Sequence, residues 1–466
     1  MTTDESGMDP RWRDRIDAIG SANFELEEML RLGFLTADQV DHSAEQLARY
    51  EATLDELAEA VAELASVREE LKGSASIATA LRAIRARRIE RVRATAQYKR
   101  TEKARLDAQR HSEWVERKTV TPVFLGRGVS SRLSFEGGDT SRQAALGLPA
   151  LTTFVDISER LDLTPSRLQW LAYERAAASS DHYSRFEIPK RSGGTRLISS
   201  PKPALRIAQQ WVRESVLSHL SPHGAAMAFR PRTSIVDNAR IHAGESVVVR
   251  MDLKEFFPSL TYVRVRGFFE SLGYNPGVAS VLALLTTDAP RARVTLDGVT
   301  TVVAVGERSL PQGACTSPDL ANLIARGLDQ RLTGLAGSRG WAYTRYADDL
   351  VFSTSVASED AGRLVRGVTG ICASEGYVVN TKKTRIMRQP NRQTVTGLLV
   401  NDGVRLTRRD LRRIRAFLHR CETQGLEAVS EDIGKSAAHV ARGYHAYATM
   451  VMPSAAARMR ANHPWI

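Results

Sequence analysis

The chain has 466 residues and a formal net charge of +12, enough length for two or three domains and a charge that favours a polyanionic partner. Three scattered cysteines, Cys315, Cys372 and Cys421, exclude a disulfide framework and a zinc site built from paired cysteines. There is neither a signal-like N-terminus nor an apolar run of membrane-spanning length, so we expect a cytoplasmic protein without a membrane partner.

Residues 1–118 are predicted to form a helical, coiled-coil-like extension. Apolar residues recur at heptad spacing, with one position skipped, at Leu47, Tyr50, Leu54, Leu57, Val61, Leu64 and Leu71. The stretch Gly73-Ser-Ala-Ser76 interrupts this pattern, and a second helical run extends from Ile77 to about Lys118. The simplest structure is a long antiparallel helical hairpin, and a dimeric coiled coil is the alternative.

The two arms of this extension carry opposite net charges. Residues 41–71 carry nine acidic residues against two arginines, whereas residues 82–110 carry eleven basic residues against three acidic ones. Two interpretations stay open. The arms attract each other across the hairpin, or the basic arm contacts nucleic-acid phosphates through a further face of its helix.

Residues 119–147 are predicted to be a linker because they are rich in Gly, Ser and Arg. From Leu148 the pattern is that of a compact domain, which we expect to reach residue 400. Residues 186–198 predict a hairpin around a Ser-Gly-Gly turn, flanked by Lys190 and Arg196. On residue type alone, these cations keep an exposed edge hairpin soluble.

Two acidic stretches carry the predicted chemistry. An apolar strand from residue 246 delivers Asp252 and turns at Pro258, and residues 341–353 predict a hairpin with Asp348 and Asp349 at or near its bend. An Asp-Asp pair alone is usually a solvated turn. Adjacent carboxylates inside a fold need a counter-charge, and hard carboxylate oxygens suit Mg²⁺. Asp252, Asp348 and Asp349 are therefore the predicted ligands of two Mg²⁺ ions, which activate an attacking hydroxyl and stabilise a leaving pyrophosphate.

Two basic or glycine-bearing segments accompany the acidic ones. Residues 310–323 form a loop that runs into a helix and contains Pro311-Gln312-Gly313. After the acidic hairpin, Lys383 is the candidate to protonate the leaving pyrophosphate or offset its charge, and Lys382 is a near-equal candidate.

In this order, Asp252, the Pro-Gln-Gly loop and Tyr346-Ala-Asp-Asp349 resemble the palm motifs of bacterial reverse transcriptases. The stretches Asn238-Ala-Arg-Ile-His242 and Val395-Thr-Gly397 resemble the retron branch in particular. The resemblance covers about Leu148 to the C-terminus. It implies an α+β fold, a right-hand polymerase with fingers, palm and thumb and an antiparallel palm sheet. The α-helical coiled-coil-like extension predicted from the heptad pattern precedes this fold.

The predicted domains are residues 1–118 (extension), 119–147 (linker), 148–400 (fingers and palm) and 401–466 (basic helical thumb). In the thumb, residues 405–420 hold seven arginines against Asp410, interleaved with apolar residues at helical spacing. That pattern is expected of a helix laid along a template–primer duplex, and a merely solvated basic helix is the alternative.

The resemblance also implies a function. We expect an RNA-directed DNA polymerase that uses dNTPs and copies a dedicated structured non-coding RNA, from an internal 2′-hydroxyl, into branched RNA–DNA for antiphage defence. The N-terminal helices would be or recruit an effector protein, or self-associate. The alternatives are a group II intron-like or abortive-infection reverse transcriptase, and a non-catalytic RNA-binding scaffold.

Residue roles follow from the same resemblance. The backbone of Leu253 joins the three aspartates at the metals. Nucleotide binding falls to Lys190, Arg196, Phe257 and Gln312. The ring of Phe257 lies beneath the incoming sugar and clashes with a 2′-hydroxyl. RNA binding falls to Asn238, His242, Val395, Thr396, Gly397, Arg408 and Arg412.

Overall fold

The computed structural model describes residues 52–54, 56–58, 60–62, 64–65, 67–69, 77–120, 122, 124–131, 133–178, 180–190, 193–296 and 299–466. The chain divides into two compact units, Met1–Arg110 and His111–Ile466.

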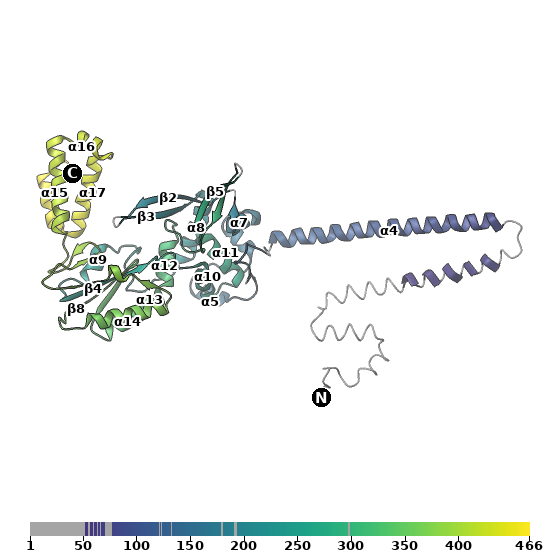
Figure 1. Cartoon of the computed structure of the whole chain (residues 1–466), viewed down its shortest axis with the longest axis horizontal. Coiled ribbons are helices and arrows are strands. Elements are labelled where there is room, and N and C mark those ends of the chain that lie inside the picture. Colours follow the sequence, from purple (N-terminus) through teal and green to yellow (C-terminus); the bar gives the residue numbers. More distant parts are fainter. Residues whose placement is uncertain are drawn as a thin grey trace, which may run out of the picture. The chain divides into compact units, whose positions relative to one another are not determined.

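The described part of the first unit is helical. The described residues between 52 and 69 are in helical turns, and α4 (Ile77–Val120) starts in this unit as one uninterrupted helix (Figure 1). It contains neither Gly nor Pro, and many of its residues are strong helix formers. The described apolar residues of the predicted seam are 48–63 % exposed; they are Leu54, Leu57, Val61 and Leu64. The rest of the seam lies outside the described residues, so the hairpin and the coiled coil stay predictions.

An antiparallel sheet forms the centre of the second unit, in the strand order β10-β4-β8-β7 with β9 beside β4. Its strands are β4 (Val247–Lys254), β7 (Ala342–Tyr346), β8 (Asp349–Thr354), β9 (Val378–Val379) and β10 (Arg385–Arg388). This is the antiparallel sheet that the palm requires.

The two faces of this sheet have different roles. Side chains of successive strand residues point to opposite faces. On one face, Val249 and Met251 of β4 belong to the larger apolar core. On the other face, Val248 belongs to a second core, and the same face then carries Arg250 and Asp252. The acidic end of β4 is thus anchored by a strand that is packed on both sides.

Helices pack against the larger core face, and Figure 1 shows α13 and α14 beside β4 and β8. They are α10 (Tyr262–Ser271), α11 (Pro276–Thr286), α12 (Ser317–Ile324), α13 (Arg326–Gly337) and α14 (Ala361–Ser374). Helix α11 is buried along nearly its whole length, which fits a sequence that is apolar on all sides.

The prediction of a linker at residues 119–147 is wrong, because this stretch belongs to the second unit and part of it is buried in that unit's core. Leu125 and Val129 are buried in the larger core. The side-chain amide of Asn275, which caps α11, donates to the carbonyl of Phe135 at 3.2 Å. The glycines that suggested a linker lie at positive φ in the turns that make this packing possible.

Short elements form the region predicted as fingers. β2 (Tyr183–Pro189) and β3 (Thr195–Pro201) form the predicted hairpin. A three-stranded antiparallel sheet comprises β1 (Ala177–Ala178), β5 (Arg291–Leu296) and β6 (Val299–Ala304). The helices that follow α4 and precede the palm sheet in the chain are α5 (Thr140–Ala145), α6 (Phe154–Arg160), α7 (Pro165–Ala172), α8 (Pro203–Ser215), η2 (Leu217–His219) and α9 (Ile235–Arg240).

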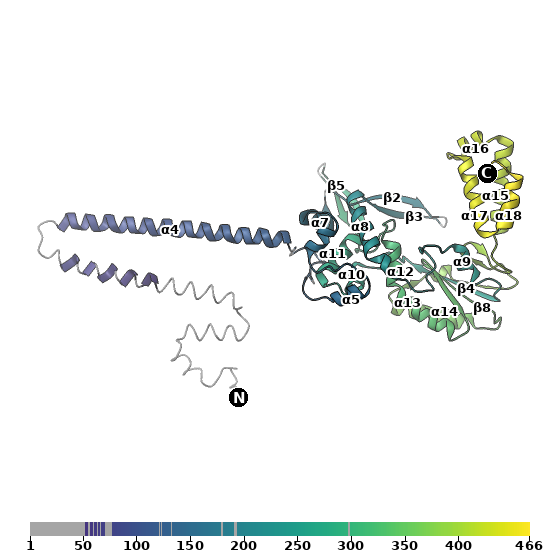
Figure 2. The ribbon, with the colours of Figure 1, turned by 180° about the vertical axis from the view of Figure 1, so that it is seen from behind.

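The C-terminal segment is helical, as expected for a thumb. After η3 (Thr381–Lys383), β11 (Thr394–Val395) and β12 (Leu398–Leu399) come α15 (Arg408–Gln424), α16 (Leu426–Ile433), α17 (Ala437–Val451) and α18 (Pro453–Asn462), which Figure 2 shows gathered together. Ile414 and Leu418 of α15 are buried in the second core, which they share with Val248 and Val351 of the palm sheet. The apolar side of α15 packs against α16 and α17.

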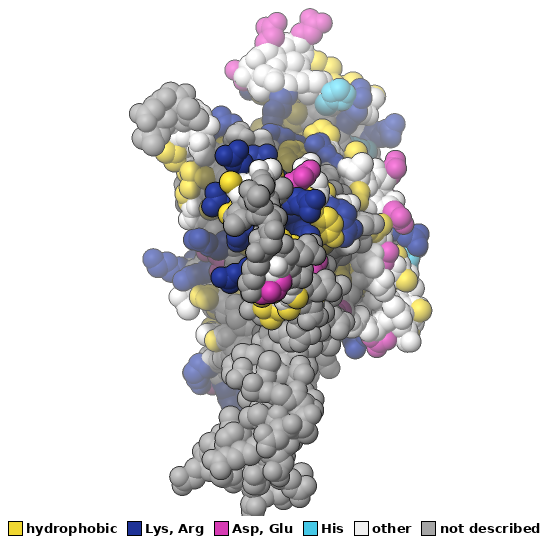
Figure 3. Space-filling model, turned by 90° about the vertical axis from the view of Figure 1, so that its right-hand side faces the viewer, with side chains coloured by type: hydrophobic (Ala, Val, Ile, Leu, Met, Phe, Trp, Pro, Cys, Tyr) yellow, Lys and Arg dark blue, Asp and Glu magenta, His cyan; other side chains and the backbone are white. Residues whose placement is uncertain are grey.

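Lys and Arg side chains are spread over the face drawn in Figure 3, in keeping with the net charge of +12. Within the described ranges, no helix combines the length and the apolar character needed to cross a membrane.

Candidate active site

Two acidic strand ends meet in the palm sheet. The antiparallel register of β4 and β8 places Asp252 directly opposite Asp349. Between β7 and β8 the chain turns through Ala347 and Asp348, with Ala347 at a φ of 57°. The amide of Leu253 donates to the carbonyl of Asp348 at 2.9 Å. The turn and the strand end are thus tied together, and the three predicted carboxylates lie at one end of the sheet.

Arg250 pairs with Asp349. Its guanidinium donates to both carboxylate oxygens at 2.8–3.2 Å, the bidentate arrangement that strengthens Arg–carboxylate pairs. Arg250 can reach Asp349 because it lies two residues before Asp252 on the same face of β4. Sequence reasoning missed this cation, although the spacing to Asp252 was a signal that both side chains share a face.

Asp252 has a different pair of partners. Lys383 donates to one carboxylate oxygen at 2.9 Å, and the side-chain amide of Asn380 donates to the other at 3.1 Å. The Lys383 side chain is 55 % exposed, so solvent screens this ion pair and the lysine is free to move. Of the two lysines weighed from the sequence, Lys383 is the one with a contact to a carboxylate; Asn380 was not foreseen.

Asp348 has no cationic partner among the side chains that the structure describes. Burial raises the pKa of its carboxyl, and the charges of Asp349 and Asp252 raise it further. Burial also raises the pKa of Asp349, while the Arg250 guanidinium opposes that rise. Carboxylates that repel each other in a partly desolvated place suit a divalent cation, whose charge stabilises their ionised forms.

The donor set fits a hard metal ion, although the side chains are not gathered around one point. Within the described ranges, no three His, Cys, Asp or Glu side chains converge as a ready-made metal site. The pairings explain this, since Arg250 holds Asp349 and Lys383 holds Asp252. The oxygens of Asp252 and Asp348, beside the backbone of Leu253, are the ligand type that Mg²⁺ prefers.

Phe257 lies close to these carboxylates in the chain and is half-buried. Its ring centroid is 5.7 Å from that of Phe256, which is buried, and 6.3 Å from that of Phe229. Phe229 and Phe257 therefore have solvent access, and the neighbouring ring of Phe256 belongs to the core.

Gln312 links the loop before α12 to the β2–β3 hairpin. Its carbonyl accepts a hydrogen bond from the amide of Ser199 at 2.7 Å. At the next residue, Gly313, φ is 112° and an added Cβ would lie 2.8 Å from a methyl group of Ile198, so only glycine fits. The Gln312 side-chain oxygen is buried and has no hydrogen-bond partner in the described part of the chain.

Lys190 and Arg196 are both exposed near the end of the β2–β3 hairpin. The amide of Lys190 donates to the carbonyl of Gly194 at 2.9 Å and closes the hairpin. Their predicted role at a triphosphate stays a prediction.

Direct RNA contact is wrong for three of the predicted residues, because Asn238, His242 and Val395 are 0 % exposed. The His242 ring nitrogens lie 2.8 Å from the hydroxyl of Ser353 and 2.7 Å from that of Thr344, so this histidine joins α9 to the palm sheet. Burial lowers its pKa to about 4, and it is neutral at pH 7.

The remaining predicted RNA-binding positions are accessible. The turn between β11 and β12 places Thr396 and Gly397 at positive φ, with Gly397 exposed and Thr396 half-buried. Arg408 and Arg412 are exposed on α15. The tight turn explains why a Gly follows the Thr, since L-residues rarely adopt positive φ.

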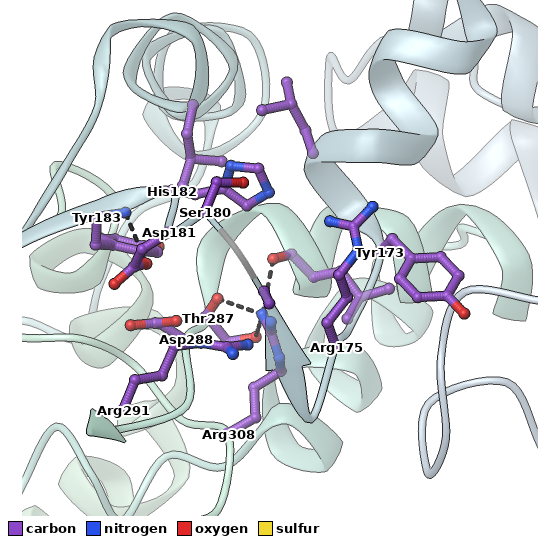
Figure 4. Close-up of a pocket in the computed structure, with 14 residues that line it drawn as sticks. Tyr173, Arg175, Ser180, Asp181, His182, Tyr183, Thr287, Asp288, Arg291 and Arg308 are labelled. Atoms are coloured by element: carbon purple, nitrogen blue, oxygen red, sulfur yellow. Dashed lines mark hydrogen bonds between the residues drawn. The ribbon is translucent and has the colours of Figure 1, made fainter. Parts of the chain in front are cut away.

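A separate polar cavity lies among α7, β2 and the end of α11, and none of the three aspartates lines it. Figure 4 shows Arg308 reaching Thr287, with Arg175 and His182 around the same space. Arg308 also pairs with Glu174, and both side chains are mostly buried. Burial, with nearby arginine charges, lowers the pKa of His182 to about 4. This cavity holds an ion network that joins elements of the predicted fingers.

A model of the reverse transcriptase (RNA-dependent DNA polymerase) family matches residues 188–400. That span contains the β4–β8 strand pair, the acidic turn and the Pro-Gln-Gly loop. Fold and site together define an RNA-directed DNA polymerase.

Relatives identify the branch. The Retron Mx162 reverse transcriptase of Myxococcus xanthus is 40 % identical over 340 residues, which cover 68 % of this chain and 70 % of that protein. The Retron Mx65 reverse transcriptase of the same organism is 41 % identical over 69 % of this chain and 73 % of that protein. The Retron Ec86 reverse transcriptase of Escherichia coli is 35 % identical over 60 % of this chain and 82 % of that protein. This chain belongs to the retron reverse transcriptases.

Solved structures are more distant. A telomerase from Candida albicans in complex with a fragment of telomeric RNA aligns with a TM-score of 0.37 and 14 % identity, over 57 % of this chain and 54 % of that chain. A likeness of this degree bears on neither the site nor the function.

Proposed function

We propose that this enzyme copies a dedicated structured non-coding RNA into branched RNA–DNA, starting from an internal 2′-hydroxyl of that RNA. The observation that carries the proposal is an intact set of three palm aspartates in a chain of the retron family. In this proposal the enzyme acts in the cytoplasm. Its product serves antiphage defence with an effector that the N-terminal helices are or recruit.

Asp252, Asp348 and the backbone carbonyl of Leu253 would hold two Mg²⁺ ions, with Asp349 as the third carboxylate of the set. When bound, such ions activate the attacking hydroxyl and stabilise the leaving pyrophosphate. The exposed ammonium of Lys383 lies beside Asp252, where it is placed to protonate the pyrophosphate or to offset its charge.

The incoming dNTP would lie between the hairpin and the palm. Lys190 and Arg196 neutralise its triphosphate, and Gln312 lies against the nucleotide. The half-buried ring of Phe257 fills the space that a 2′-hydroxyl would need, which favours dNTPs over rNTPs. The hydrogen bond between the Gln312 loop and β3 supports this arrangement, since it couples the hairpin to the palm.

The RNA template and the growing duplex would lie along exposed basic and turn residues. Arg408 and Arg412 on α15 contact the phosphates of the duplex, and the exposed Thr396–Gly397 turn contacts the structured RNA. The opposite side of α15 is packed in the second core, so the helix presents its arginines from a fixed position.

The experiment is to purify the full chain from its native host and to digest the copurifying nucleic acid separately with RNase and with DNase. We expect short DNA joined to RNA by a linkage that survives denaturation. It should be absent from Asp348→Ala and present in Glu307→Gln, which alters an exposed acid outside the site. Finding no DNA, or DNA that Asp348→Ala leaves unchanged, would reject the proposal and favour an externally primed polymerase or an RNA-binding scaffold.

A further inference from the structure

A fully buried guanidinium lies behind the acidic turn. Arg345 is on β7, and its side chain and that of Asp329 on α13 are both 0 % exposed. Arg345 donates to both carboxylate oxygens of Asp329, at 2.8 and 2.6 Å. Taking an ion pair out of water is costly, and it is tolerated only when the hydrogen-bonding groups of both partners are used.

The third nitrogen of Arg345 links two other segments. Nη1 donates to the side-chain oxygen of Asn322 on α12 at 3.0 Å and to the carbonyl of Ala347 at 3.2 Å. The Asn322 amide in turn donates to the carbonyl of Ala228 at 2.8 Å. Every nitrogen of the guanidinium is therefore engaged, and the group joins two helices to the turn that carries the aspartates.

Ala347 is the first residue of that turn. Its φ of 57° lies in the left-handed region, which is unfavourable for a residue other than glycine. Such a conformation persists only where the surroundings fix it. Arg345 holds the carbonyl of Ala347, and the next two residues are Asp348 and Asp349.

The same guanidinium also contacts the aromatic group. Its central carbon lies 5.5 Å from the ring centroid of Phe256, within the range of a cation–π contact. The Phe256 ring in turn lies 5.7 Å from that of Phe257. A single buried cation thus touches both the backbone of the acidic turn and the ring that underlies Phe257.

We propose that Arg345 is a positioning residue that fixes the Phe257 ring relative to the acidic turn. It touches no substrate and acts through Ala347 and Phe256. A lysine at this position would keep the charge but lose the planar fork, because an ammonium is a compact charge on a flexible stem. The proposal has two parts: Arg345 affects the preference for dNTPs over rNTPs through Phe257, and it affects the rate of the reaction through the acidic turn. The first part rests on the proposed role of Phe257, and the second does not.

The test compares Arg345→Lys with Arg308→Lys in the full chain. Arg308 is also mostly buried and paired, with Glu174, but its partners lie away from the acidic turn. It therefore controls for the general cost of removing a buried guanidinium. Extension of a DNA primer on an RNA template is measured with dTTP and with UTP, below the unfolding midpoint of each variant.

We expect Arg345→Lys to lower kcat about tenfold to a hundredfold with little change in the KM for dTTP, because a small misplacement of the reacting groups slows the step after binding. The preference for dTTP over UTP should fall as well. Arg308→Lys should lower the unfolding midpoint and leave kcat and the preference unchanged. Equal kcat and equal preference in the two variants would overturn the proposal.

Two further variants keep the result interpretable. If Arg345→Lys does not fold, Asn322→Ala removes one acceptor of Nη1 and leaves the pair with Asp329 in place. A kcat in Asn322→Ala as high as that of Arg308→Lys then overturns the proposal. Phe257→Ala separates the two parts: an unchanged preference for dTTP in that variant rejects the role of Phe257, while the kcat comparison still decides the role of Arg345.

Discussion

Asp348 and Asp349 are adjacent in the chain, and their electrostatic surroundings differ. Arg250 engages both carboxylate oxygens of Asp349, whereas none of the described cations pairs with Asp348. A guanidinium in that geometry stabilises the ionised carboxylate, and neighbouring carboxylates destabilise it. Asp348 is therefore the member of the set with the greatest need of a divalent cation.

Replacing Arg250 by Met should move the acid limb of the pH–rate profile to higher pH. Asp349 loses the charge that lowers its pKa, so a higher pH is needed to ionise it. Initial rates of primer extension across the acidic and neutral range measure this shift. Arg385→Met is the matched control, since Arg385 lies opposite Arg250 on β10 and donates to backbone carbonyls. A profile that does not move, or moves equally in the control, contradicts the prediction.

Replacing Asn238 by Leu should raise the free energy of unfolding by about 1 kcal/mol. Both polar atoms of this amide are buried and have no hydrogen-bond partner in the described structure, and an apolar side chain of similar size removes that cost. Chemical denaturation of the two proteins measures the difference. A lower stability in Asn238→Leu would show that the amide is satisfied by ordered water.

At the scale of elements, the two retron-like stretches, residues 238–242 and 395–397, hold other elements in place through hydrogen bonds. His242 joins the end of α9 to β7 and β8, and the Thr396 hydroxyl donates to the carbonyl of Ile235 at 3.2 Å. These contacts fix α9 and the β11–β12 turn to the palm sheet. The positions of these stretches that an RNA can reach are the exposed Arg240, Ile241 and Gly397 and the half-buried Thr396.

Stability should fall as pH decreases from about 7 to about 5, and His242 should contribute about 2 kcal/mol to that fall. Its pKa of about 4 in the folded protein is below the value of 6.5 for a free histidine, so in this window the unfolded chain binds the extra proton. His242→Gln should flatten the dependence of the free energy of unfolding on pH. The exposed His439→Gln is the control, and an equal slope in wild type and His242→Gln would disprove the prediction.

For the whole molecule, charge sets the expected binding behaviour. The chain has a net charge of +12, and the arginines of α15 lie opposite its packed side. Each phosphate contact releases counterions, so the affinity for a template–primer duplex must fall as salt rises.

Arg408→Gln and Arg412→Gln should each weaken duplex binding and reduce the slope of log K against log salt by about one. Arg420→Gln is the control on the same helix, because Arg420 is already paired with Asp432 and Gln424. Fluorescence anisotropy of a labelled RNA–DNA duplex over a series of salt concentrations measures the slopes. If all three variants have the same slope as wild type, the arginines of α15 do not contact the phosphates of the duplex.

Local patterns were enough to predict much of this fold and site. Apolar residues in strand-like runs or at helical spacing identified β4, the acidic hairpin, the β2–β3 hairpin and the basic helix α15. Such patterns can be found in the sequence because the repeats of a strand and of a helix depend only on backbone geometry. The order of Asp252, the Pro-Gln-Gly loop and the Asp-Asp pair was sufficient to suggest the enzyme class that the family match then showed.

Tertiary structure alone decided which charges meet and which polar residues are buried. Arg250 and Asp349 are 99 positions apart, and His242 lies 111 positions from Ser353. No local period encodes such pairs, because they form only when separate strands adopt one register and helices close over the sheet. For the same reason, Asn238 and His242 could be mistaken for RNA contacts, and residues 119–147 for a linker. The sequence determined the chemistry that the chain contains, and the packing of distant segments determined where each group acts.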